Sequence, residues 1–160
     1  MRVTRHAALR CFAPILGKKP WRAALGFGSF LTFEFGRRVR HGRFWHGTRH
    51  LWIYMSSWRL DGPHGLLVTS DSPRELISRV VPRLVAHPLT AVEIKPRARC
   101  TTFEFERFLL TVTPFSVEEE TSRNPADYWL FFMPRDMILT VRPRSGISID
   151  RSDRPRNRAS

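Results

Sequence analysis

Apolar and polar residues first alternate in the segment GSFLTFEFG, residues 28–36. Leu31, Phe33 and Phe35 fall on one face, while Thr32 and Glu34 fall on the other. This period of two is typical of a β-strand with one buried face. We therefore expect a core strand here.

The segment LWIYMSSWRL, residues 51–60, has apolar side chains on both faces. One face carries Trp52, Tyr54 and Trp58, and the other carries Leu51, Ile53 and Met55. Strands that are apolar on both faces lie at the centre of a sheet, so this segment predicts a central strand. The sequence DGPHG that follows indicates a turn, and LLVTS after it completes a hairpin.

One helix is expected over residues 73–85. Ser72 and Glu75 form the Ser-x-x-Glu pattern of a capping box, and Pro73 suits the first helical position. Apolar residues then recur at helical spacing: Leu76, Ile77, Val80, Val81, Leu84 and Val85. Because Pro82 lacks a backbone donor, we expect the helix to kink or end there. The apolar stripe predicts that one face of the helix packs on a sheet.

The stretch TTFEFERFLLTVTPF, residues 101–115, indicates the position of its own turn. One register places six alternating residues on one face by pairing Phe105 with Phe108, Phe103 with Leu110 and Thr101 with Val112. The reversal then falls at Glu106 and Arg107, which offer neither the Gly nor the Asn that tight turns prefer. We therefore expect a hairpin with a loose or strained turn.

The order of these elements predicts an α+β fold: a curved, mostly antiparallel sheet of about six to eight strands with one main helix on one face. LTAVEIKP, residues 89–96, is a further strand, and YWLFFMPRDMILTVRP, residues 128–143, is a last hairpin with Pro134 in its turn. We expect one domain over residues 26–145, a flexible basic leader over residues 1–25 and a disordered basic tail over residues 146–160.

The segments GSFLTFEFG, HLWIYMSSWRL and LFFMPRDMILTVRP together resemble strand motifs of a group of small uncharacterised bacterial α+β proteins. The resemblance extends from about Gly26 to Val141 and covers most of the expected core. It implies no activity for this chain, and it suggests that the two ends are additions to a shared core.

The first 26 residues contain six basic residues and no acidic residue. A targeting leader has this charge, but Arg10 and Pro14 interrupt the apolar window and serine is missing. A flexible basic arm, a targeting leader and an over-long gene start all remain possible interpretations of this segment.

Charge is the main compositional feature, because 27 Lys and Arg face 14 Asp and Glu for a net charge of +13. Residues 1–50 hold 11 basic residues against 1 acidic residue, whereas residues 51–120 hold 8 against 9. The chain has no uninterrupted apolar run long enough for a transmembrane helix. Its two cysteines cannot form a disulfide framework, which fits a reducing, cytoplasmic setting.

The densest basic segment is GRRVRHGRFWHGTRH, residues 36–50, which we expect to form a loop. Guanidinium groups bind phosphates, and aromatic rings offer stacking faces for bases. The segment therefore suggests binding to a polyanion, such as single-stranded nucleic acid, or to an acidic protein, although a simply solvated loop has the same pattern. The candidate residues are Arg37, Arg38, Arg40, Arg43, Trp45 and Arg49.

Histidines 41, 46 and 50 lie in the same segment. Gly42 and Gly47 favour a loop, no carboxylate or cysteine is adjacent in sequence, and the arginines would repel a cation. We therefore predict no metal ligand, and no nucleophile motif or phosphate-binding loop indicates a catalytic residue or a cofactor.

Three classes of function fit these patterns. The preferred one is a non-enzymatic binding module that presents the basic loop to an acidic partner. An immunity-type protein that neutralises another protein is an alternative by analogy of architecture alone. An enzyme is the third, with its site in an aromatic cavity formed by Trp52, Tyr54 and Trp58, where distant polar residues such as Asp61 and His64 would have to converge.

Overall fold

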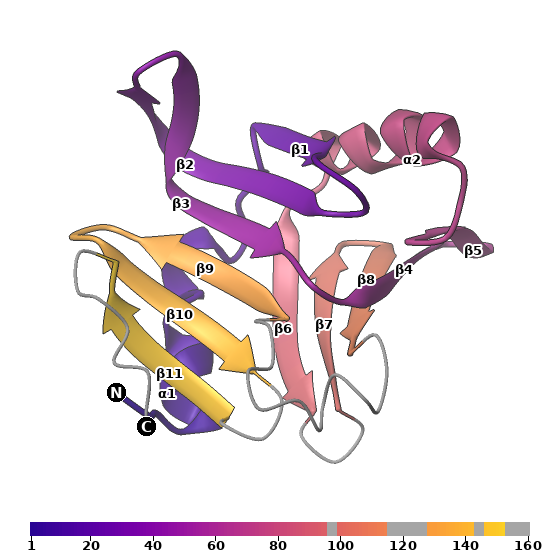
Figure 1. Cartoon of the computed structure of the whole chain (residues 1–160). Helices are drawn as coiled ribbons and strands as arrows, with labels where there is room; N and C mark the ends of the chain where they lie inside the picture. Colours follow the sequence, from indigo (N-terminus) through magenta and orange to yellow (C-terminus); the bar gives the residue numbers. More distant parts are fainter. Residues whose placement is uncertain (96–98, 115–127, 143–145, 153–160) are drawn as a thin grey trace.

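Two antiparallel sheets make up the fold in the computed structural model, which describes residues 1–95, 99–114, 128–142 and 146–152 (Figure 1). In spatial order the six-stranded sheet contains β1 (Arg22–Leu25), β2 (Leu31–His41), β3 (Phe44–Ile53), β9 (Trp129–Met133), β10 (Met137–Arg142) and β11 (Gly146–Arg151). The five-stranded sheet contains β5 (Gly65–Thr69), β4 (Ser57–Gly62), β8 (Phe108–Thr113), β7 (Cys100–Phe105) and β6 (Leu89–Lys95). The α-helices are α1 (Arg5–Arg10) and α2 (Arg74–Val80).

The core lies between the two sheets. Leu31, Phe33 and Phe35 are all buried, which confirms the expected inner face of that strand. Phe33 stacks on Phe105 of the other sheet with ring centroids 5.3 Å apart. Offset aromatic pairs of this kind add to the stabilisation from burying their surface.

The expectation of a single curved sheet is wrong, because the segment over residues 51–60 belongs to both sheets. Its first part is β3, which lies between β2 and β9 as the prediction of a central strand requires. β3 ends at Ile53, and β4 begins at Ser57 in the other sheet. Between them, the buried Ser56 hydroxyl donates to the Tyr128 carbonyl at 3.1 Å. The serine thereby satisfies polar backbone where the chain passes from one sheet to the other.

The expected hairpin registers are confirmed. Phe105 pairs with Phe108, Phe103 with Leu110 and Thr101 with Val112. Glu106 has a φ of +53°, so the turn without glycine is strained, as its composition predicts. The β4–β5 hairpin and the β9–β10 hairpin also form at the expected turns.

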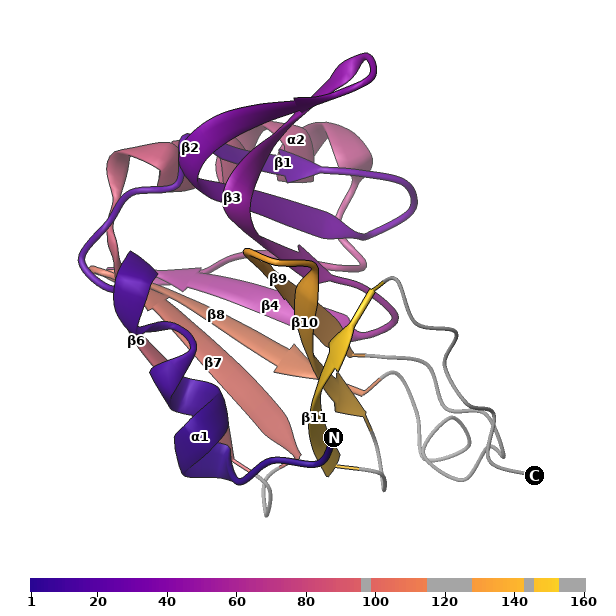
Figure 2. The same cartoon turned by 90° about the vertical axis from the view of Figure 1, so that its left-hand side faces the viewer.

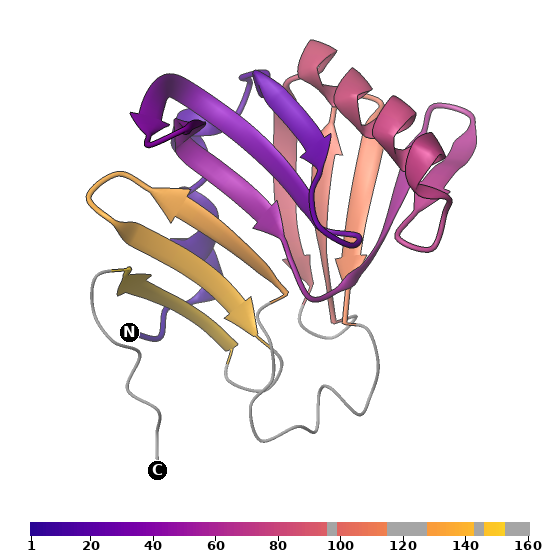
Figure 3. The same cartoon turned by 45° about the horizontal axis from the view of Figure 1, so that its top comes forward.

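The single main helix is not found. The α-helix stops at Val80, and residues Val81–Ala86 continue as a 3₁₀-helix in which Pro82 occupies the first turn. The capping box is absent too, because Ser72 Oγ accepts from the Thr69 backbone N–H at 2.9 Å instead of capping the helix. α2 and this 3₁₀ segment pack beside β1 and β5 at one end of the molecule (Figure 3). The fold is therefore α+β only in the broad sense of antiparallel sheets with two short helices.

Residues 1–25 belong to the fold, which corrects the expectation of a flexible leader. α1 lies against β6 and β11 (Figure 2), and β1 pairs with β2. Phe12 is fully buried and stacks on Phe131, with ring centroids 4.4 Å apart. It also meets Phe103 and Trp129 edge to face, so this residue contacts both sheets. Burial of this apolar ring holds residues 1–25 against the core, although their charge alone predicts a solvated segment.

The expected disordered tail begins as a strand. Gly146–Arg151 forms β11 and pairs along β10, and Arg2 forms a bridge with Ser148. Residues 153–160 and the polar connection over residues 115–127 lie outside the described part of the chain. Within that described part, no helix has the length and apolar character needed to cross a membrane.

Replacing Phe12 tests whether α1 belongs to the cooperative core. We expect Phe12→Ala to lower the free energy of unfolding by about 3–5 kcal/mol, since it removes a fully buried aromatic ring. Urea denaturation monitored by circular dichroism measures this. Phe27→Ala is the control, because Phe27 is 87% exposed and its loss should have little effect. Equal stabilities for the two variants would contradict the placement of residues 1–25 in the core.

Candidate functional site at the β2–β3 hairpin

The basic segment over residues 36–50 is a hairpin and not a loop. It consists of the distal parts of β2 and β3, joined at Gly42 and Arg43, with His41 paired to Phe44. The hairpin projects beyond both sheets (Figure 1). No acidic residue lies between Phe35 and Leu60 in the sequence, so the projecting part carries only positive charge.

A β-bulge separates this hairpin from the rest of the sheet. Phe35 pairs with Arg49, but the next pair is Arg38 with Gly47, so β2 has one extra residue. Gly36 begins the bulge at φ +76°, a conformation that glycine adopts without strain. Beyond the bulge, the cross-strand pairs alternate between two faces.

One face of the hairpin, here called the arginine face, carries Arg38, Arg40 and Trp45. Arg40 pairs directly with Trp45, and the Arg38 guanidinium lies 4.6 Å from the centroid of the Trp21 ring. Arg40 Nε also donates to the Gly42 carbonyl at 3.0 Å, which holds the side chain along the hairpin. The cation–π contact ties the base of the arginine face to residue 21, next to β1.

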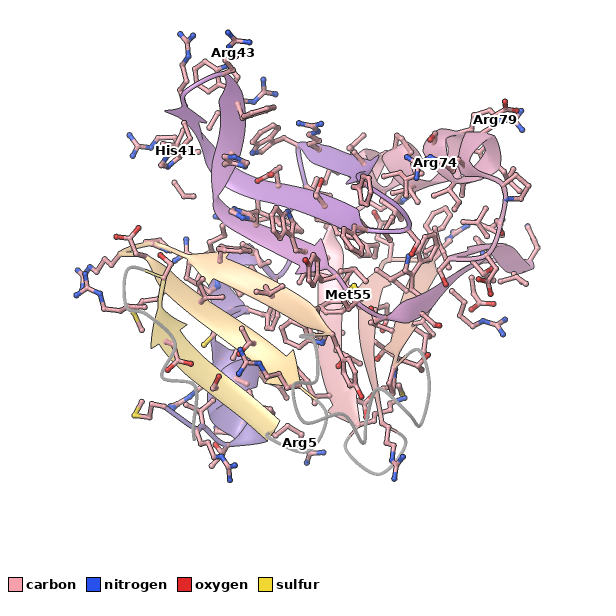
Figure 4. All side chains as sticks on the ribbon, in the orientation of Figure 1. Arg5, His41, Arg43, Met55, Arg74 and Arg79 are labelled. Carbon is pink, nitrogen blue, oxygen red and sulfur yellow. The ribbon has the colours of Figure 1, made fainter. Side chains whose placement is uncertain are left out.

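The structure distributes the six predicted polyanion-binding residues over the hairpin, with Arg38, Arg40 and Trp45 on the arginine face. Arg37 is exposed in the bulge, and Arg43 lies at the tip of the hairpin (Figure 4). Arg49 is half-buried at the base. At the tip, Trp45 is 50% exposed and Phe44 is 69% exposed. The predicted set thus omitted Phe44, the more exposed of the two rings.

The opposite face, here called the histidine face, carries a buried carboxylate with two imidazoles. Glu34 is only 3% exposed, and its Oε1 lies 3.3 Å from His46 Nδ1. Its Oε2 lies 3.9 Å from His50 Nδ1, too far for a hydrogen bond. A buried carboxylate needs compensating partners, and the His46 ring and a backbone donor supply them.

Gly47 permits this arrangement. Its backbone N–H donates to Glu34 Oε2 at 2.8 Å. A Cβ atom at this position would lie 2.1 Å from the Phe35 carbonyl oxygen, so no larger residue fits without moving the backbone. The close approach of β2 and β3 therefore orients the carboxylate of Glu34.

His50 lies in an apolar setting. Its ring stacks on Phe132 with centroids 4.1 Å apart and on His46 with centroids 5.3 Å apart. Burial, and to a lesser extent the neighbouring His46, lower the pKa of His50 to about 4. His50 is thus a neutral imidazole at pH 7.

A cleft of about 540 Å³ lies beside the histidine face. The β2–β3 hairpin forms one wall with Val39 and His41, and the β9–β10 turn forms the other with Arg135 and Asp136. His46 and His50 both line it. His41 lies on the side of the hairpin that faces this turn (Figure 4).

The structure corrects the sequence argument that no carboxylate is near the histidines. Glu34 pairs with His50 across the ladder, although 16 positions separate them in the sequence. One ligand atom from each of Glu34, His46 and His50 can be chosen so that all three lie within 4.8 Å of one another. A predicted hairpin register that pairs residue 34 with residue 50 would have brought these three side chains together already at the level of the sequence.

The aromatic residues expected to line a catalytic cavity are divided between the sheets. Trp52 and Tyr54 stack on the outer face of the six-stranded sheet, with centroids 6.3 Å apart. Trp58 is buried in the other sheet, where its Nε1 donates to the Ser29 carbonyl at 2.7 Å.

The polar residues named with that cavity do not converge on it either. Asp61 is engaged by Arg59 at 2.7 Å, which lowers the pKa of the carboxyl. His64 lies in the β4–β5 turn. These residues therefore do not form a catalytic group around the aromatic side chains.

No protein family matches this chain, and neither a curated protein nor a solved structure is significantly similar to it. The resemblance to small bacterial proteins stays a prediction.

The lowered pKa of His50 predicts a pH-dependent stability. The unfolded chain takes up a proton at His50 near pH 6.5, whereas the folded protein resists it until about pH 4. This contribution is therefore fully present above pH 6.5 and is lost as the pH falls towards 4, by at most about 3 kcal/mol. Urea denaturation at pH 7 and pH 4.5, in the presence of EDTA, measures the loss.

We expect His50→Gln to lose less stability between these two pH values than the wild type does. His64→Gln serves as the control, because His64 is an exposed turn residue and its removal should leave the pH dependence unchanged. The same loss in all three proteins would show that His50 is not the group responsible.

Proposed function

We propose that this protein is a non-enzymatic binding module whose β2–β3 hairpin binds single-stranded nucleic acid. The observation that carries the proposal is the exposure of Phe44 and Trp45 at the tip of a projecting hairpin that carries exposed arginines and no acidic residue from Gly36 to Ile53. A cytoplasmic site of action is part of this proposal.

The charges of the hairpin support a polyanionic partner. Arg37, Arg40 and Arg43 are exposed, and none of them forms an ion pair with a described residue. Guanidinium groups bind phosphate oxygens in a forked geometry and release counterions as they do so. The arginines can therefore follow a phosphate backbone along the hairpin.

The aromatic rings favour nucleic acid over an acidic protein. Phe44 and Trp45 are adjacent in β3, so they project from opposite faces of the hairpin. Unpaired bases stack on such rings, and each stacked base contributes about 1–3 kcal/mol. An acidic peptide would use the arginines but would gain little from exposed ring faces.

Titration of the full chain with a fluorescent oligothymidine, at several salt concentrations, tests the charge component. We expect the triple variant Arg37→Ala/Arg40→Ala/Arg43→Ala to bind more weakly. The slope of log affinity against log salt should become shallower by about 2, at about 0.7 per phosphate contact on a single strand. Arg79→Ala/Arg83→Ala/Arg107→Ala is the matched control, because it removes the same charge from exposed sites outside the hairpin.

A Trp45→Ala variant tests the stacking component. It should weaken binding by about 1–3 kcal/mol without changing the salt slope. The proposal fails if the two triple variants lose equal affinity, since the charge effect would then be nonspecific. If heparin and oligothymidine bind alike and Trp45→Ala changes neither, the partner is an acidic macromolecule other than nucleic acid.

A further inference from the structure

We propose that Glu34, His46 and His50 bind a divalent transition-metal ion of the Zn²⁺ class at the base of the β2–β3 hairpin. The site is on the histidine face, so it is independent of the nucleic-acid binding proposed for the tip and the arginine face. Two imidazoles and one carboxylate are a donor set found in zinc sites with an open position and in iron sites.

The separations between the donor atoms already approach those of a metal site. Ligands about 2.0–2.1 Å from a tetrahedral zinc ion lie about 3.3 Å from one another. Glu34 Oε1 and His46 Nδ1 are 3.3 Å apart, and Glu34 Oε2 and His50 Nδ1 are 3.9 Å apart. The three ligand atoms all lie within 4.8 Å of one another, so an ion bound between them would draw the side chains closer together.

The surroundings of the carboxylate resemble the second layer of contacts around a metal site. Gly47 N–H donates to Glu34 Oε2 at 2.8 Å and fixes the orientation of the carboxylate. Hydrogen bonds of this kind hold ligating groups in place before the ion binds. Phe132 stacks on His50 and keeps that ring against the sheet.

Arg38 and Arg40 do not lie on the face of the hairpin that carries this site. Val39, which is apolar, is the residue paired with His46, while Arg38 and Arg40 pair with Gly47 and Trp45 on the arginine face. Glu34 contributes a buried negative charge directly to the site. The repulsion of a cation by these two arginines, which the sequence predicts, is therefore reduced by their position on the opposite face of the folded hairpin.

The cluster borders the cleft, because His46 and His50 both line it. His41 lines the same cleft, and its ring centroid is 6.1 Å from that of His46. Asp136 and Arg135 lie across the cleft in the β9–β10 turn. A bound ion would thus have room for water or for a small anionic ligand on its open side.

The first test uses the tag-free full chain and Co²⁺, whose visible absorption reports its coordination. We expect one equivalent of Co²⁺ to develop bands that Zn²⁺ abolishes by competition, and Mg²⁺ to have no effect because it avoids nitrogen ligands. His46→Gln and His50→Gln should each weaken Zn²⁺ binding by about tenfold or more, as expected for damage to a metal site. His64→Gln is the control and should bind like the wild type.

Unfolding in EDTA checks that each variant still folds. Glu34→Gln should weaken Zn²⁺ binding in the same way. If it does not fold, His46→Gln remains a valid test, because the His46 side chain is 33% exposed and contributes less to the core. The proposal is overturned if the wild type binds no Zn²⁺ at micromolar concentrations, or if His46→Gln and His50→Gln bind it as tightly as His64→Gln does. Mg²⁺ binding as tight as that of Zn²⁺ would also overturn it.

Discussion

The burial of two apolar sheet faces against each other is the constraint on which this structure depends. Neither sheet can remove its inner face from water by itself, so Phe33 must meet Phe105, and Phe103 must meet Trp129. Phe12 contacts both sheets and extends this core to the N-terminal segment. The functional candidates lie outside this core, on the β2–β3 hairpin and at its base.

The hairpin departs from this arrangement because it extends past its neighbouring strands. β1 pairs with β2 only as far as Glu34, and β9 pairs with β3 only as far as His50. Beyond these residues two strands stand alone, and isolated two-stranded ribbons are marginally stable. The contacts at the base, Arg38 over Trp21 and Glu34 with the histidines, therefore stabilise its position as well as offering chemistry.

Where alternation and turn position agreed, the sequence was sufficient to predict structure. The register of Phe105 with Phe108 followed from face and spacing alone. The break between β3 and β4 is not predicted, because residues 51–60 carry apolar side chains on both faces and only Ser56 and Ser57 interrupt them where the chain changes sheets. A local pattern contains no information on which sheet a strand joins.

The N-terminal segment and the histidine face were missed for related reasons. The basic charge of residues 1–25 predicts a flexible, solvated segment, whereas one buried ring, Phe12, determines where these residues pack. Glu34 was assigned to a solvent-facing position, because strand periodicity separates the two faces but does not say what covers the outer one. Glu34 meets His46 and His50 only because residues 34 and 50 pair across a hairpin. Gly42 and Gly47 favour a loop in the sequence, so this pairing was not predicted.

The bulge at Gly36 determines which side of the hairpin each chemistry occupies. In a regular ladder the three steps from Phe35 to Arg38 would pair Arg38 with His46 and Arg40 with Phe44, so both arginines would share a face with the imidazoles. The bulge accommodates one extra residue of β2, and Arg38 therefore pairs with Gly47 while Val39 pairs with His46. Without it, cation repulsion would replace the present separation of a basic surface from an imidazole–carboxylate cluster. The division of this small hairpin into two chemically distinct faces therefore depends on the glycine that accommodates the extra residue, and a substitution at Gly36 would disturb both faces at once.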